Sequence, residues 1–220
     1  MKRNIVIATV AAAALVGGGT ATAVAFSGDS AAPSAPSASA TPRSSVDVPD
    51  DDVHEDAREA RAATVSAPQA AAAALKATPG TVTGIDLDQD RPGLVWEVDV
   101  LGKDGTWHEV TLDAGNAKVL NQHVEHEGDD HGIARARAGL KGTTVDAAQA
   151  AEKAAATYGK VTSVDLDDDH RSTPVWEVET VSKDGKEHQL NVDPKTAAVT
   201  VAPQDKDNDD NDNDNDGQDD

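Results

Sequence analysis

The chain has 220 residues, of which 40 are acidic and 19 basic, giving a formal net charge of −21. This charge excludes nucleic acid and anionic membrane surfaces as general partners, because their phosphate groups would be repelled. Cysteine is absent, so a disulfide framework and thiol catalysis are excluded as well. Aromatic residues make up only 2% of the chain and alanine supplies much of its apolar content, which predicts small cores.

The N-terminus has the pattern of an export segment. Lys2 and Arg3 precede an apolar run at 5–16, and small residues that fit an A-x-A cleavage site follow up to Ala25. We therefore predict a signal peptide over 1–25. The alternative is an uncleaved membrane anchor, because the apolar stretch approaches the ~20 residues needed to cross a bilayer. Both interpretations place the remaining chain outside the cytoplasm, either secreted or in the cell envelope.

Residues 26–63 contain few large apolar side chains. The first part is rich in Ser, Ala and Pro, and the later part is acidic. Such a segment buries too little surface to offset its conformational entropy, so we predict a disordered linker. A short solvated helix within 47–61 is the alternative for its last part.

Most of the remaining chain is an internal repeat. The stretch 94–120 returns, in altered form, as 174–201. Matching residues lie 80 positions apart: Trp96 and Trp176, Asp104 and Asp184, His108 and His188, and Asp113 and Asp193. A constant offset over so many residues indicates a duplicated structural unit. We predict two units of one fold, at 64–121 and 143–201, and expect this part to fold without either terminal segment.

Each unit is expected to begin with an alanine-rich helix. Ser66 and Asp146 are candidate N-caps, and each is followed three positions later by glutamine, which is the capping-box pattern. The helices should end near Thr78 and Thr157, close to glycine or proline.

A short strand and a β-hairpin should follow each helix. Trp96, Val98 and Val100 alternate with acidic residues, which is the period of a strand with one buried face. Asp-Gly at 104–105 and again at 184–185 is a strong signal for a tight turn. The predicted fold class is α+β: two tandem repeats, each one helix packed on a small antiparallel sheet (α-β-β-β), with a short final strand.

The alternation also assigns the large side chains. Trp96 and Trp176 face inward and are predicted core residues, whereas Trp107 falls on the opposite face. His108 and His188 lie on the inward side near the turns, where we expect structural histidines.

The order and spacing of these features resemble the PepSY domain family. The shared blocks are the capped helix, V-x-x-[IV]-D-L-D, W-E-V and K-D-G-x-x-H, then V-D or L-D at the end of the second hairpin arm. Copy two keeps Thr196 and Val199 of the last block but has Ala197 where the family prefers glycine. Copy one lacks the threonine. The resemblance covers both units, and its specificity comes from the order of the blocks together.

The resemblance implies a role in the cell envelope or in the propeptides of secreted metallopeptidases, with no catalytic residues. It implies a non-enzymatic protein that binds and modulates, by inhibition, a secreted or envelope peptidase. A protein partner is therefore expected and no cofactor, with membrane contact only if the N-terminal segment stays uncleaved. No nucleophile elbow marks a hydrolase.

Divalent-cation binding or sensing is the alternative function. Residues 122–142 form a predicted linker that contains His123, His126 and His131 among carboxylates. The zinc-protease motif H-E-x-x-H is not met, because His131 follows His126 by five positions instead of four. Glycine and charge on both sides leave little to preorganise these ligands, so we expect weak metal binding at most.

The predicted disordered tail, 202–220, matches the start of an EF-hand calcium loop. The candidate ligands at loop positions one, three, five and nine are Asp212, Asp214, Asp216 and Asp220. The sequence ends before the acidic residue at position twelve, so loose counterion binding by an acidic tail is favoured.

Overall fold

The computed structural model describes residues 42–49, 55–90, 93–125, 130–167 and 173–202. All of them lie within one compact unit, 40–220. The helices in these ranges are α1 (Glu55–Ala62), α2 (Ala67–Ala77), α3 (Asp130–Leu140) and α4 (Ala147–Tyr158). The strands are β1 (Gly80–Asp90), β2 (Gly93–Gly102), β3 (Trp107–Asp113), β4 (Val119–Glu125), β5 (Lys160–Asp167), β6 (Val175–Val181), β7 (Glu187–Val192) and β8 (Val199–Val201). The predicted export segment and most of the predicted tail lie outside the described residues.

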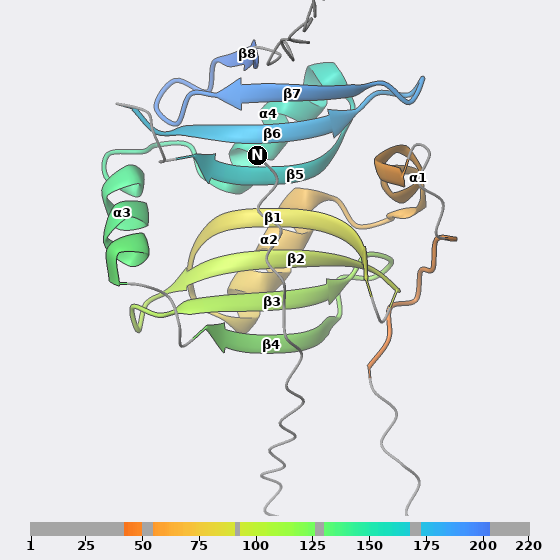
Figure 1. Ribbon diagram of the computed structural model, residues 1–220, viewed down its shortest axis with the longest axis horizontal. Coiled ribbons are helices and arrows are strands. Elements are labelled where there is room, and N and C mark those ends of the chain that lie inside the picture. Colours follow the sequence, from red (N-terminus) through yellow and green to blue (C-terminus); the bar gives the residue numbers. More distant parts are fainter. Residues whose placement is uncertain (1–41, 50–54, 91–92, 126–129, 168–172, 203–220) are drawn as a thin grey trace, which may run out of the picture. The chain divides into compact units, whose positions relative to one another are not determined.

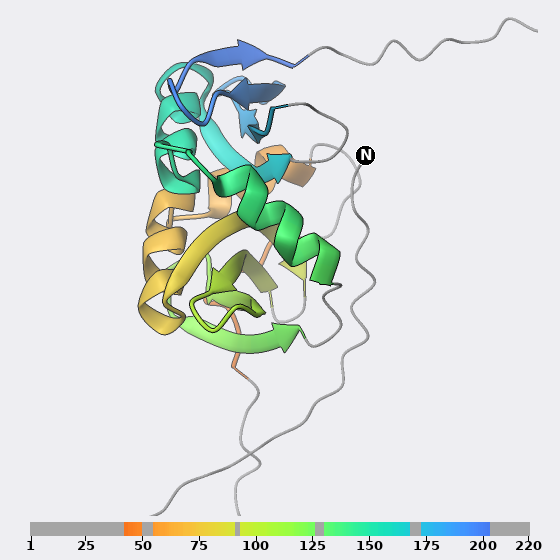
Figure 2. The ribbon, with the colours of Figure 1, turned by 90° about the vertical axis from the view of Figure 1, so that its left-hand side faces the viewer.

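The eight strands form one antiparallel sheet in the order β4-β3-β2-β1-β5-β6-β7-β8 (Figure 1). Helices α2 and α4 cover one face of this sheet (Figure 2). The α+β class with two tandem units is confirmed, and each unit contributes one covering helix and four strands. The final strand is short, as predicted, in the second unit, whereas β4 of the first unit has seven residues. No helix among the described residues is long and apolar enough to cross a membrane.

The two units are joined by pairing of their first strands, which the sequence did not predict. The register pairs of β1 with β5 are Ile85 with Val164, Gly84 with Asp165, and Asp86 with Ser163. Ile85 and Val164 are equivalent positions, 79 residues apart in the repeat. Exchanging the two copies therefore maps this contact onto itself, as in an isologous dimer interface. An approximate two-fold axis relates the two halves of the sheet at this pair.

A β-bulge in each first strand explains an irregular spacing in the repeat. The register shifts between Val82 and Gly84 in β1, and between Val161 and Ser163 in β5. One extra residue at each bulge lets side chains three positions apart, such as Val82 and Ile85, point to the same face. The V-x-x-[IV] block therefore encodes a bend, with both apolar residues in the core.

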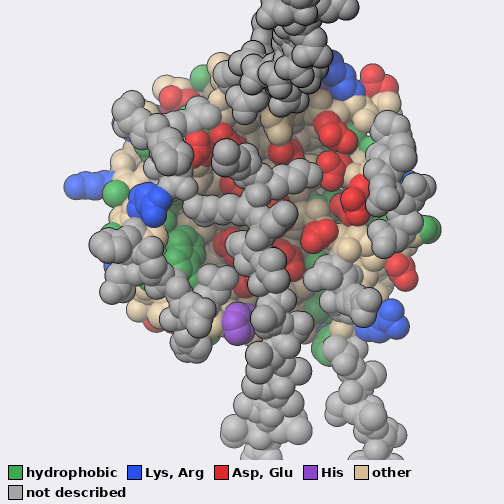
Figure 3. All heavy atoms as spheres, in the orientation of Figure 1, with side chains coloured by type: hydrophobic (Ala, Val, Ile, Leu, Met, Phe, Trp, Pro, Cys, Tyr) green, Lys and Arg blue, Asp and Glu red, His purple; other side chains and the backbone are tan. Residues whose placement is uncertain are grey.

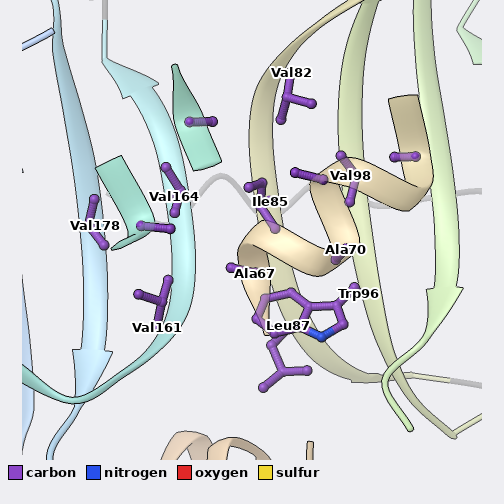
Figure 4. Close-up of a cluster of buried hydrophobic side chains, with 14 of the residues drawn as sticks. Ala67, Ala70, Val82, Ile85, Leu87, Trp96, Val98, Val161, Val164 and Val178 are labelled. Carbon is purple, nitrogen blue, oxygen red and sulfur yellow. The ribbon is translucent and has the colours of Figure 1, made fainter. Parts of the chain in front are cut away.

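The core lies between the sheet and the two alanine faces of α2 and α4. Trp96 and Trp176 are its largest members, with exposures of 1% and 0%, so the predicted inward facing is confirmed. Figure 4 shows Trp96 among the core side chains of the first unit. The indole Nε1 of Trp96 donates to the Val65 carbonyl at 3.0 Å, and that of Trp176 to the Val145 carbonyl at 2.9 Å. Each tryptophan thus ties the sheet to the residue before a helix N-cap.

Both predicted helix caps are present. The amide of Ser66 donates to Gln69 Oε1 at 2.9 Å. At the second helix, the amide of Asp146 donates to Gln149 Oε1 at 3.0 Å, and the amide of Gln149 donates back to Asp146 Oδ1 at 2.8 Å. These bonds satisfy amides that helix starts otherwise leave unpaired.

Residues 42–49, which we call the N-terminal strap, pack against the first unit. The amide of Leu94 donates to the Val46 carbonyl at 2.9 Å, and Ser44 Oγ donates to the Leu94 carbonyl at 2.6 Å. Val48 is buried in the main core. The predicted disordered linker is therefore corrected for 42–49, because two valines and the free backbone of Leu94 give this segment an anchor that its composition did not reveal.

Asp113 holds the other side of the strap. Its carboxylate accepts the amide of Ser45 at 2.9 Å and the Ser45 hydroxyl at 2.8 Å. Burial acts to raise the pKa of Asp113, but hydrogen bonds from Ser45, Gly115 and Asn116 outweigh it and hold the pKa below its usual value. Asp113 therefore stays ionised and fixes the strap at neutral pH.

Helices α1 and α3 lie within the predicted linkers 26–63 and 122–142, and α1 falls where a short helix was the alternative to disorder. Each precedes one unit and packs on the hairpin of the other. Ala57 and Ala60 of α1 are buried against Val181 of the second unit. The guanidinium of Arg61 lies over the turn glycine Gly185. In the same way α3, which precedes the second unit, lies on the hairpin of the first unit, with Arg137 over Gly105. The two units therefore depend on each other for packing.

We expect Trp176→Ala to destabilise the protein far more than Trp107→Ala. The first change empties a core position and should cost about 3–5 kcal/mol. Trp107 is half-buried on the opposite face, so its substitution should reduce the free energy of unfolding by clearly less. Urea denaturation of both variants and the wild type measures the difference. Equal midpoints would contradict the assignment of the two faces.

Removing the strap and α1 should also lower stability. A chain beginning at residue 42 should unfold like the full chain. A chain beginning at residue 64 loses the burial of Val48, Ala57 and Ala60, and we expect a loss of at least about 2 kcal/mol. Thermal and urea unfolding of the two truncated chains tests this. Identical curves would show that the predicted boundary at 64 suffices.

Candidate protein-binding face

The face of the sheet opposite α2 and α4 carries acidic side chains from both units (Figure 3). The alternation of the strands places nine carboxylates on it, and we call this surface the acidic face. Its members are Asp86, Asp88, Glu97, Asp99, Glu109, Asp165, Asp167, Glu177 and Glu179.

The same residue pattern that builds the core builds this face. In β1, Ile85 and Leu87 point to the helices, so Asp86 and Asp88 point away. The two-fold relation repeats the arrangement in the second unit. Equivalent carboxylates are Asp86 and Asp165, Asp88 and Asp167, Glu97 and Glu177, and Asp99 and Glu179. Joining β1 to β5 therefore merges two acidic strips into one surface.

Strand register sets carboxylates directly opposite one another. The cross-strand pairs are Asp86 with Glu97, Asp99 with Glu109, and Asp165 with Glu177. Gly84 lies between Asp99 and Asp165, and a Cβ there would meet Asp99 Oδ2 at 3.0 Å and Asp165 Oδ1 at 3.2 Å. Like charges that lie opposite one another contribute unfavourably to the stability of a sheet.

Burial, together with the neighbouring charges, shifts the protonation of two of these carboxyl groups. Burial, followed by the charges of Asp165, Glu179 and Asp88, raises the pKa of Asp86 to about 8. At the border of the face, burial and the charge of Asp88 are the main causes that raise the pKa of Glu59 to about 7. Part of the acidic face therefore carries protons near neutral pH.

Glu59 also connects α1 to the sheet. It is only 2% exposed, and its Oε1 accepts the amide of Gln89 at 3.1 Å. Helix α1 thus contacts β1, the central strand that carries Asp86 and Asp88 of the acidic face. A change of protonation at Glu59 acts on both elements.

The histidines near the turns have structural surroundings, as predicted. His108 is 9% exposed, and its Nε2 lies 2.9 Å from Asp104 Oδ2 and 2.9 Å from Thr106 Oγ1. The ring of His188 packs on Tyr158 with centroids 5.4 Å apart. Both histidines therefore stabilise the turn ends of their hairpins through these contacts.

The predicted metal ligands are only partly within the described residues. His123 is exposed on β4, opposite Glu109 of β3. The backbone at His131 belongs to α3, whereas His126, Asp212, Asp214, Asp216 and Asp220 lie outside the described ranges. In the part of the chain that the structure describes, no group of three or more His, Asp or Glu side chains is arranged to hold a metal ion. Cation binding by the histidine linker and the tail stays a prediction.

The sequence and fold were compared with known proteins. A profile of the PepSY family, described as "Peptidase propeptide and YPEB domain", matches residues 64–123 and 143–200, more than half of the chain. The chain belongs to the PepSY family. It carries two tandem PepSY units, as the repeat predicted. No curated protein matches this chain.

One solved structure with a similar chain comes from Clostridium difficile 630, where the protein is described as a candidate lipoprotein. It shares 24% sequence identity, covering 63% of this chain and 92% of that chain, with a TM-score of 0.40.

Sequence reasoning missed the acidic face of the PepSY protein, although its signal was present. The acidic residues that alternate with Trp96, Val98 and Val100 are Glu97 and Asp99, and their counterparts in the second unit are Glu177 and Glu179. Only the pairing of the two units shows that these strips form one continuous surface.

Asp86→Asn should stabilise the protein at alkaline pH. Because the folded pKa of Asp86, about 8, lies above the unfolded value near 3.8, the protonated carboxyl supports folding at low pH. That contribution is lost as pH rises through about 8. We expect the variant and the wild type to be similar at pH 4, and the variant to be more stable at pH 9 by at least about 1 kcal/mol.

Urea titrations at several pH values measure this difference. Glu152→Gln, on the exposed side of α4, is a matched control that removes one charge away from the acidic face. An Asp86→Asn variant that tracks the wild type at every pH would contradict the assigned protonation.

Proposed function

We propose that this PepSY protein is a non-enzymatic, extracytoplasmic binding protein that modulates, by inhibition, a secreted or envelope peptidase. The family description, which includes peptidase propeptides, supports a peptidase as the partner. The export pattern of the N-terminus supports a location outside the cytoplasm. The acidic face is proposed as the contact surface.

The observation that carries this proposal is the register of the acidic face. Three cross-strand pairs place carboxyl groups directly opposite one another, and the two units together gather nine such groups on one surface. Local rules are commonly broken at functional sites. A partner surface rich in Lys and Arg would relieve the repulsion on contact, which supports a basic partner.

A binding role also fits the rigidity of the surface. The carboxylates stand on paired strands whose other face is packed in the core, so their backbone positions are fixed before a partner arrives. Hydrolysis would instead require an activated nucleophile or a metal triad. The sequence contains neither a nucleophile elbow nor H-E-x-x-H.

The test is direct binding of the full chain to secreted peptidases of the same cell at low and high salt. Glu97→Gln and Glu177→Gln remove symmetry-related charges from the acidic face, and Glu152→Gln is the control on α4. We expect each acidic-face variant to weaken binding roughly threefold to tenfold at low salt, equal to about 0.7–1.4 kcal/mol. Added salt should weaken the wild-type complex, because it screens charges beyond about 8 Å.

Peptidase activity measured in the same mixtures separates inhibition from simple binding. An affinity that changes neither in the acidic-face variants nor with salt would place the contact elsewhere. Casein cleavage by the purified chain alone would overturn the non-enzymatic role.

A further inference from the structure

A shallow hollow of about 500 Å³, largely open to solvent, lies between α3 and the first unit. Its walls come from the start of β1, the end of β2 and the C-terminal turn of α3. Figure 2 shows α3 crossing beside these strands. Neither the PepSY pattern nor the acidic face accounts for this space.

The lining is basic, in contrast to the chain as a whole. Lys103 comes from the hairpin, whereas Arg137 and Lys141 come from the end of α3. No carboxylate is among the lining residues, although the net charge of the chain is −21. Figure 3 shows basic side chains at the left margin, over α3. All three side chains are exposed, and an anion between them would interact favourably with each.

The nearest carboxylate along the sequence is held aside. Asp104 Oδ1 accepts the amide of Thr106 at 3.1 Å, and Asp104 Oδ2 lies 2.9 Å from His108 Nε2. The Thr106 amide is the main reason that the pKa of Asp104 is lowered. Asp104 is thus bound within the turn and is not among the residues that line the hollow.

The second unit fills the equivalent place. Lys160 of β5 is the counterpart of Thr81 in β1, and its Nζ donates to the Ala60 carbonyl at 2.6 Å and the Ala63 carbonyl at 3.2 Å. There Val181, the counterpart of Leu101, is buried against α1. Lys160 thus holds the C-terminal end of α1 against the sheet of the second unit.

In the first unit the lysine is replaced by Thr81, which is three side-chain bonds too short for that role. The helix is nevertheless held at the turn, because the guanidinium of Arg137 lies over Gly105 just as that of Arg61 lies over Gly185. The space beneath α3 therefore remains open, with Thr81 exposed at its edge.

A purely structural explanation accounts for only part of the lining. Arg137 and Lys141 lie at the C-terminal end of α3, where positive charge interacts favourably with the helix dipole. That interaction explains neither Lys103 nor the volume of the hollow. Leu101 and Leu140 add an apolar wall, which an inorganic ion would not use.

We propose that this hollow binds a small organic anion that carries carboxylate or phosphate groups beside an apolar portion. Its volume lies within the range of about 300–1,000 Å³ that is usual for ligand pockets. Arg137 can hold two anion oxygens with its planar fork, and the two lysines supply further positive charge. The apolar portion lies against Leu101 and Leu140. The site lies on the same side of the sheet as the acidic face, near Leu101, but shares no residue with it.

The test is calorimetric titration of the full chain with 1-naphthyl phosphate, 1-naphthoate, inorganic phosphate and citrate. We expect the naphthyl compounds to bind at least tenfold more tightly than the two anions without an aromatic group. The better of the two naphthyl probes distinguishes phosphate from carboxylate recognition. Lys103→Gln and Arg137→Gln should each weaken that binding at least tenfold. Lys183→Gln, the equivalent turn position of the second unit, should leave it unchanged.

Thr81→Lys is the decisive variant, because it places the lysine of the second unit into the first. It adds positive charge, so simple surface attraction predicts tighter anion binding. If the new lysine side chain fills the hollow, as Lys160 does in the second unit, binding of the naphthyl probes should be lost. Tighter binding by Thr81→Lys, or no binding of any probe by the wild type, would overturn the proposal. Circular dichroism checks folding, and the exposed Lys103→Gln variant keeps the test valid if Thr81→Lys does not fold.

Discussion

The antiparallel contact of β1 with β5 is the constraint on which the rest of the structure depends. Around Ile85 and Val164 it turns two four-stranded units into one sheet and removes two edges that would otherwise offer unpaired backbone groups. It also aligns the helix faces over one core and the carboxylates over one surface. The exchange of α1 and α3 between hairpins follows from it, because each preceding helix then lies within reach of the other unit.

The strand period links the core to the acidic face in this PepSY protein. Every apolar residue that turns toward the alanine helices forces its neighbour to the other face, and in both units that neighbour is usually acidic. Small alanine side chains let α2 and α4 approach the sheet closely, and the buried tryptophans fill the space that remains. The core therefore supplies the stability that offsets the repulsion of the acidic face, including the burial of Asp86.

The two copies agree at the centre and differ at the periphery. The strap binds only where Leu94 provides an amide and Gly115 leaves room; Pro174 and Lys195 occupy these positions in the second unit. Lys160 closes the helix–sheet junction of the second unit, whereas Thr81 leaves the hollow of the first unit open. Single substitutions outside the repeated core have thus given each half its own attachments without altering the shared sheet.

The sequence by itself determined the elements that depend on near neighbours. Capping at Ser66 and Asp146, the hairpin turns and the inward tryptophans all follow from spacing and local hydrogen bonding, and the repeat determined that there are two units. Only the tertiary structure decided the rest: the pairing of Ile85 with Val164, the strap on Asp113 and the continuous acidic face. These contacts join residues far apart in the chain. The backbone groups of an edge strand or of a Ser-rich segment can form hydrogen bonds with a distant segment or with water, and the local sequence is the same in both cases.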